Sequence, residues 1–195
     1  MKIGKLKINS ARPVVLKEGT LYELGVKRLN LITSNGKIFS FPEALRNGRS
    51  SYVIFENLIR ELTGLESVRH FDHIDQKGNI YEQKSYKDPQ IHPKSSPEFQ
   101  CSSSNTFGAN NYGPKVKKLL KKGDYPGALK LCKDLSYKEI DFFIFTNTSQ
   151  WSPKVPLRFF MVSKANVLKS LSKTDPRLVC RDRLMATLRR KTVLV

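Results

Sequence analysis

The sequence predicts a mixed α/β (α+β) fold in which helices flank a β-sheet, and three observations support this. Residues 50–62 carry apolar side chains at helical spacing. Residues 68–87 alternate between apolar and polar side chains around a turn-forming glycine, which favours two short antiparallel strands. Residues 139–147 and 157–162 are nearly continuous apolar runs, which are typical of buried strands.

The length of the chain indicates one domain. It has 195 residues, of which 39% are hydrophobic, so it can bury a core. We expect a single domain over residues 1–195, with residues 1–49 as an N-terminal extension. Within that extension residues 1–8 suit a strand or a basic arm, and residues 21–32 suit either a helix or a strand. The apolar runs at 29–33 and 37–41 flank a hairpin-type turn, which favours their pairing.

The first clear helix is expected over Ser50 to Leu62. Ser50 or Ser51 is a candidate N-cap, and the Thr63-Gly64 pair supplies a C-terminal stop. Its apolar positions are Tyr52, Phe55, Ile59 and Leu62. Glu56 lies beside this apolar stripe, either as a solvated carboxylate or as a third acidic group of a site formed with the hairpin that follows.

The hairpin over Val68 to Lys87 carries the chemistry of the chain. If Gln76 to Gly78 form a three-residue loop with Gly78 in the left-handed conformation, the register places Asp72 opposite Glu82. His70 would then face Lys84. Lys84 shares a strand face with Glu82 because side chains alternate with a period of two.

This register predicts a magnesium site. Directly opposed residues of an antiparallel pair have Cβ atoms about 4.5–5.5 Å apart. Two carboxylates at that separation repel each other unless a cation lies between them, and hard oxygen ligands suit Mg²⁺. We therefore expect Asp72 and Glu82 to be the metal ligands, with Lys84 beside them. Asp75 is a rival ligand to Asp72, although the alternation of side chains favours Asp72.

Residues 88–113 are rich in Pro, Ser and Asn and are expected to form a polar loop insertion beside the hairpin. Amide and hydroxyl side chains can contact base edges, and lysines can contact phosphates. The alternative is a plain surface insertion. The side chains that we expect to contact DNA, from the end of the hairpin to the next helix, are Ser85, Lys87, Gln90, Lys94, Asn110, Asn111, Lys117 and Lys118.

The second half of the chain is expected to complete the sheet and its covering helices. Residues 114–135 predict two short helices that break at Gly123, the first of them strongly basic. Ser163 is a candidate cap for a helix over residues 164–171, and a last helix is expected from Asp175-Pro176 to about residue 190.

The charge of the chain points to a polyanionic partner. It has 35 Lys and Arg against 17 Asp and Glu, a formal net charge of +18. Nucleic acid is the favoured partner because neutralised phosphates release condensed counterions. An acidic membrane surface is the weaker alternative, since no apolar run of 18 residues is present. Three separated cysteines and no evident secretory signal predict a reducing, cytoplasmic setting.

The order of helix, acidic hairpin, Glu-x-Lys and further strands and helices resembles the PD-(D/E)xK nuclease superfamily. The matching residues are Asp72 in HFDHID and Glu82-Gln83-Lys84 in IYEQKSY. The resemblance implies a restriction-endonuclease-like mixed sheet flanked by helices, with Asp72 and Glu82 binding Mg²⁺. It implies that Lys84 activates the attacking water or stabilises charge, and that Glu56 joins the catalytic group.

Most similar is the type II restriction endonuclease class, which implies cleavage of double-stranded DNA by a homodimer. Three alternatives stay open. One is a junction resolvase or nicking enzyme on the same fold, and another is a non-catalytic basic protein that binds nucleic acid. The third is a ββα-metal nuclease, because His73, Asn79 and His92 follow the His-Asn-His order, but their spacing is loose and supporting CxxC pairs are absent.

Overall fold

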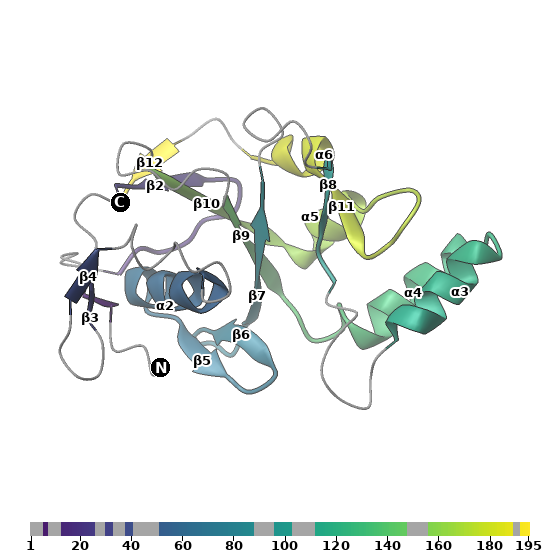
Figure 1. Ribbon diagram of the computed structural model, residues 1–195, viewed down its shortest axis with the longest axis horizontal. Coiled ribbons are helices and arrows are strands. Elements are labelled where there is room, and N and C mark those ends of the chain that lie inside the picture. The colour runs from purple at the N-terminus through teal and green to yellow at the C-terminus, as the bar shows by residue number, and fades with distance from the viewer. Residues whose placement is uncertain are drawn as a thin grey trace.

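A seven-stranded mixed sheet forms the centre of the computed structural model (Figure 1). The structure describes residues 6–7, 13–25, 30–32, 38–40, 51–87, 96–102, 112–147, 156–188 and 192–195. In the order in which they lie side by side, the strands are β12 (Thr192–Leu194), β2 (Leu21–Leu24), β10 (Leu157–Ser163), β9 (Phe142–Asn147), β7 (Ile80–Tyr86), β6 (Phe71–Ile74) and β5 (Glu66–Val68).

The strands β5, β6 and β7 form an antiparallel meander, and β7 then pairs in parallel with β9. A parallel pair requires a crossover connection. Here the crossover contains the strand β8 (Glu98–Gln100) and the helices α3 (Gly113–Lys121) and α4 (Tyr125–Leu135). The β9–β10 and β10–β2 pairs are antiparallel, and β12 pairs in parallel with β2 at the edge of the sheet. The predicted mixed α/β class is therefore confirmed.

The helix α2 (Ser51–Thr63) covers one face of the sheet. It ends where expected, because Gly64 adopts φ +71° and its N–H bonds to the carbonyl of Arg60. Its buried residues pack with those that face it from the central strands. This cluster includes Ile54, Phe55, Leu58, Ile59, Leu62, Tyr22, Tyr81, Ile144 and Phe159. Full burial of such side chains stabilises the fold by roughly 1.5–3 kcal/mol each.

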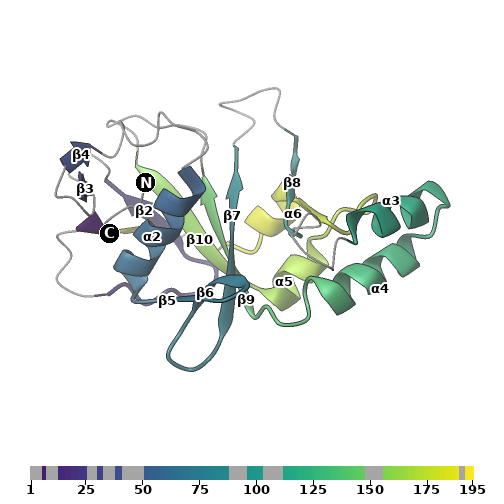
Figure 2. The same cartoon turned by 60° about the horizontal axis from the view of Figure 1, so that its bottom comes forward.

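The opposite face is covered by α3, α4 and α5 (Lys164–Lys169), as Figure 2 shows. Phe143, Phe145 and Phe160 of the sheet pack there against residues of these helices. The strand β9 is therefore buried on both sides, as its continuous apolar sequence predicts. The predicted break at Gly123, which has φ +75°, and the predicted cap Ser163 are also present.

Two smaller sheets complete the described part of the chain. The strands β1 (Leu6–Lys7), β3 (Asn30–Ile32) and β4 (Ile38–Ser40) form one, and the predicted pairing across the 34–37 turn is the β3–β4 pair. Of the two options for residues 21–32, the strand is correct where these residues are described, as β2 and β3.

The other small sheet corrects two predictions. The strand β8 lies within the expected polar loop, and it pairs with β11 (Leu178–Cys180). The last helix was predicted wrongly over residues 175–190. Of its described residues, 175–188, only Arg181–Met185 form a helix, α6, because residues 178–180 pair with a strand almost 80 positions earlier. Within the described ranges, no helix has the length and apolar character needed to cross a membrane.

Candidate active site

The hairpin of β6 and β7 has the register that the sequence predicts. His73 lies opposite Tyr81, and Ile74 lies opposite Ile80. The loop closes through Gly78, which adopts φ +85° and donates its N–H to the carbonyl of Asp75. Continued by one residue, this register brings Asp72 to the level of Glu82. Only the expected partnership of His70 with Lys84 is wrong, because His70 forms a turn between β5 and β6 with φ +76°.

The two strands separate at Asp72. The ladder between them ends at the pair of His73 and Tyr81. Beyond that pair, the N–H of Gln83 on β7 donates to Asp72 Oδ2 at 2.6 Å. A carboxylate thus takes the place of a main-chain carbonyl in the ladder. The strands open at this point, and the Asp72 carboxylate lies between them.

Glu82 and Lys84 form an ion pair on one face of β7. Their side chains are only 15% and 17% exposed, so both charges have lost most of their hydration. Burial and the neighbouring charge of Asp72 raise the pKa of Glu82, although Lys84 opposes this. Burial alone would lower the pKa of Lys84, but Glu82 and Asp72 raise it above its usual value, so the ammonium stays charged.

Glu56 and Arg60 bring α2 into the same electrostatic group. Burial and the charge of Asp72 raise the pKa of Glu56 to about 7, and Glu82 adds to the effect. Arg60 lies one helical turn further, 4.0 Å from Glu56 Oε2, and its Nη1 donates to the main-chain carbonyl of Asp72 at 3.2 Å. Arg60 was not predicted, because its contact with Asp72 joins residues on different elements.

Asp75 lies at the closed end of the hairpin and is occupied there. Its Oδ1 accepts from the N–H groups of Lys77 and Asn79 at 2.9 Å each. Its Oδ2 accepts from the Asn79 amide at 2.8 Å and from the Tyr81 hydroxyl at 3.0 Å. Partial burial would raise the pKa of Asp75, but these hydrogen bonds lower it. The arrangement is that of a turn-stabilising aspartate.

A second polar row lies on the other face of β7 and was not predicted. His73 Nε2 and Gln83 Oε1 are 2.8 Å apart, and Gln83 Nε2 donates to Thr146 Oγ1 at 3.3 Å. Burial lowers the pKa of His73, so its imidazole is neutral. Asn79 is hydrogen-bonded to Asp75, and His92 lies outside the described residues. In the described part of the chain, His73 and Asn79 therefore do not form a ββα-metal site.

The predicted DNA contacts fall in two places where they are described. Ser85 and Lys87 are exposed at the end of β7, and Lys117 and Lys118 are exposed on α3. The other four, Gln90, Lys94, Asn110 and Asn111, lie outside the described residues.

The side chains of the hairpin suit a hard divalent cation. Carboxylate oxygens are its preferred ligands, and Glu56, Asp72 and Glu82 outnumber the two nearby cations, Lys84 and Arg60. Within the described ranges no three His, Cys, Asp or Glu side chains form a ready metal site. Two protein carboxylates are nevertheless a usual set for Mg²⁺, which keeps several of its waters.

Comparison with models of known protein families gave no match. Neither the curated proteins nor the solved structures contained a significant match to this chain. The case for a function therefore depends on the residues and their geometry.

Proposed function

We propose that this chain is a Mg²⁺-dependent nuclease that hydrolyses phosphodiester bonds of double-stranded DNA. The observation that carries the proposal is the placement of Asp72, Glu82 and Lys84 at the point where β6 and β7 separate. Glu56 of α2 acts on the same group electrostatically. The resemblance to the PD-(D/E)xK superfamily assigns chemistry to these same positions.

In this proposal Asp72 and Glu82 hold the cation. When bound, Mg²⁺ would supply Lewis-acid stabilisation of charge on the phosphate and acidify a water molecule. Lys84 is held by Glu82 and keeps its proton, because its pKa is raised. Of the two roles that the family resemblance allows for this lysine, its protonation favours stabilisation of negative charge over removal of a proton. Glu56 is the group whose proton can be exchanged near neutral pH.

The finer assignment is a type II restriction endonuclease, which acts as a homodimer on a short site. It is supported by the family resemblance and by the net charge of +18.

The decisive experiment is incubation of the protein with plasmid DNA, with Mg²⁺ and with EDTA. Discrete bands that require Mg²⁺ are expected for a site-specific enzyme, and a smear indicates a nuclease without sequence preference. Cleavage of a four-way junction in preference to duplex would indicate the resolvase alternative. Intact DNA that is nevertheless bound would favour the non-catalytic basic protein and overturn the proposal.

Two substitutions test the residues directly. Lys84→Ala and Glu82→Gln are expected to reduce cleavage by about 10²–10³-fold or more while DNA binding is retained, because each removes a group that acts on the reacting phosphate. Glu66→Gln is the matched control, since Glu66 is an exposed carboxylate on β5 of the same meander. Full cleavage by either site variant would contradict the assignment.

A further inference from the structure

The helix α3 presents one entirely basic face. Its inward side chains are Val116, which is fully buried, and the half-buried Leu119 and Leu120. At 100° per residue the lysines fall on the opposite half of the helix. We call this exposed surface the lysine face; it consists of Lys115, Lys117, Lys118 and Lys121, together with Lys122 just after the helix.

The positive charge of this lysine face is offset only in part, since Lys117 acts electrostatically on Asp175. In the parts of the chain that the structure describes, no ion pair joins an α3 lysine to a carboxylate. The nearest acidic residue in sequence, Asp124, caps α4 by accepting from the N–H of Gly127 at 2.8 Å. The neighbouring helix differs, since its Lys130 pairs with Asp134. The α3 face is therefore a concentrated and unpaired positive charge.

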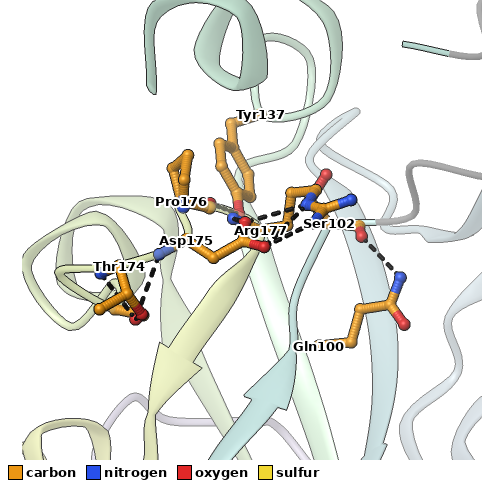
Figure 3. Close-up of polar contacts among 8 residues, drawn as sticks. Gln100, Ser102, Tyr137, Thr174, Asp175, Pro176 and Arg177 are labelled. Atoms are coloured by element: carbon orange, nitrogen blue, oxygen red, sulfur yellow. Dashed lines mark hydrogen bonds and ion pairs between the residues drawn. The ribbon is translucent and has the colours of Figure 1, made fainter. Parts of the chain in front are cut away.

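The base of the α3–α4 hairpin is fixed to the rest of the fold. Tyr112, at the start of α3, hydrogen-bonds to Ser102, which also donates to Ser136 Oγ at 2.8 Å just after α4. The next residue, Tyr137, donates to the carbonyl of Pro176 at 2.8 Å (Figure 3). The lysine face is thus carried on an anchored support, which lowers the entropy lost on binding.

The same segment is fixed once more from the side of β8. The carbonyl of Arg177 accepts the N–H groups of Cys101 and Ser102 at 2.9 and 3.1 Å, and the guanidinium of Arg177 binds Asp175, as Figure 3 shows. The end of β8 and the two ends of the helical hairpin therefore meet at one polar junction.

The α3–α4 hairpin covers the face of the sheet on which Glu82 and Lys84 lie, whereas Glu56 comes from α2 on the other face. Glu82 and Lys84 are in parallel register with Phe143 and Phe145, whose side chains pack against α3 and α4. The charge of Lys84 also acts on the Tyr112 phenol. Figures 1 and 2 show β6 and β7 between α2 and the α3–α4 hairpin. A DNA duplex at the site would therefore lie beside α3.

We propose that the lysine face of α3 binds the phosphate backbone of duplex DNA, and supplies affinity without sequence preference. The inference depends on the proposed function only in taking duplex DNA as the ligand. Nine residues make α3 about 14 Å long, which spans about four steps of one DNA strand. An anionic membrane fits less well, because the apolar side of α3 is already packed inside the protein.

The test is DNA affinity in EDTA, measured by fluorescence anisotropy of a 20-base-pair duplex over a series of KCl concentrations. The variant is Lys117→Gln with Lys118→Gln and Lys121→Gln. Each lost phosphate contact is expected to flatten the slope of log K against log salt by about 0.9. Three lost contacts would flatten it by about 2.7 and weaken binding roughly a hundredfold near 0.15 M salt.

The matched control removes the same charge from α4 and the segment that follows it. Its substitutions are Lys130→Gln, Lys133→Gln and Lys138→Gln, all at exposed positions. It is expected to keep most of the slope and affinity. An equal loss in both triple variants would overturn the proposal, because the effect would then be one of net charge. Binding of the wild-type protein to phosphatidylserine vesicles, lost in the α3 variant while DNA binding is unchanged, would also overturn it.

The outcome is separable from that of the proposed function. DNA binding through α3 without cleavage in Mg²⁺ would support this inference and refute the nuclease. Cleavage with an unchanged salt slope in the α3 variant would refute this inference and leave the nuclease in place.

Discussion

The β6–β7 hairpin carries an aspartate near each of its ends, and the two carboxylates have different surroundings. At the closed end Asp75 accepts four hydrogen bonds from the turn and from Tyr81. At the open end Asp72 accepts one N–H from Gln83 and acts on the charges of Glu82 and Glu56. The two residues are only three positions apart in the chain.

The two carboxylates therefore differ in how far the protein already satisfies them. Donors that surround Asp75 stabilise its charge and lower its pKa, so it has little left to offer a ligand. Asp72 instead lies near two partly buried carboxylates, Glu56 and Glu82, and its charge helps to raise the pKa of each. A cation would relieve that repulsion, which is the property expected of a metal site.

The largest expected effect comes from replacing each of the two aspartates in turn and comparing the rates of cleavage. Asp72→Asn should reduce Mg²⁺-dependent cleavage by about a hundredfold or more, equivalent to about 2.7 kcal/mol of transition-state stabilisation. Asp75→Asn should leave cleavage within a few-fold of wild type. Initial rates on plasmid DNA measure both. The opposite result would identify Asp75 as the ligand.

The free energy of unfolding should depend more on Asp75 than on Asp72. Asp75→Ala is expected to lower the free energy of unfolding by about 1–2 kcal/mol, because it removes partly exposed hydrogen bonds to a charged acceptor. For a chain of this length that corresponds to a fall in Tm of roughly 2–8 °C. Because the folded pKa of Asp75 is lowered, its contribution is present above the unfolded pKa and is lost as pH falls through the folded value. A melt at pH 7 and below pH 3 should therefore show the difference narrowing in acid.

Local chemistry accounts for what could be predicted. Gly78 in the turn and the alternation of side chains were sufficient to give the register that relates Asp72 to Glu82. The apolar spacing before Gly64 gave α2, and the continuous run at 139–147 gave the buried β9. In each case the signal lies within about 15 consecutive residues.

What the sequence could not provide depends on distant contacts. The three residues of β11 are a strand only because β8 lies beside them, and the pairing of β12 with β2 joins the two ends of the chain. The contact of Arg60 with the Asp72 carbonyl and the buried pair of His73 and Gln83 follow from the packing of α2 and β6. No local periodicity reports such contacts.

The carboxyl group of Glu56 should make the stability of the protein depend on pH. The pKa of Glu56 is raised to about 7, so its favourable contribution to stability is present below the ordinary pKa of 4.5 and is lost as pH rises through about 7. Glu56→Gln should therefore stabilise the metal-free protein at pH 8.5 by about 1–2 kcal/mol, after allowance for partial solvent screening, and by much less at pH 5. Thermal melts in EDTA at the two pH values test this.

Magnesium should reverse that pH dependence in the wild-type protein. A cation competes with protons for the carboxylates, so the stabilisation by Mg²⁺ should grow as pH rises from 6 to 8. The increase should be smaller in Glu56→Gln. Equal thermal shifts from Mg²⁺ at both pH values in wild type would mean that protonation of Glu56 is not linked to metal binding. The carboxylates at the open end of the hairpin would then not act as a group on a bound cation.

The smallest expected effect concerns Arg60, which connects α2 to the open end of the hairpin. Arg60→Gln removes the cation 4.0 Å from Glu56 and should raise the pKa of Glu56 further, by roughly half to one pH unit. A carboxyl-carbon NMR titration of the metal-free protein measures this without reference to catalysis, and cleavage at pH 7 should fall only a few-fold. Arg60→Lys should restore the pKa of Glu56, since it restores the positive charge. It should not restore the planar guanidinium, which donates to both the Asp72 carbonyl and Asn57 Oδ1. Arg69→Gln, at an exposed position in the β5–β6 turn, is the control and should leave Glu56 unchanged. If Arg60→Lys failed to restore that pKa, Arg60 would act by holding the main chain of Asp72, and the open end of the hairpin would depend on α2 for its geometry more than for its charge.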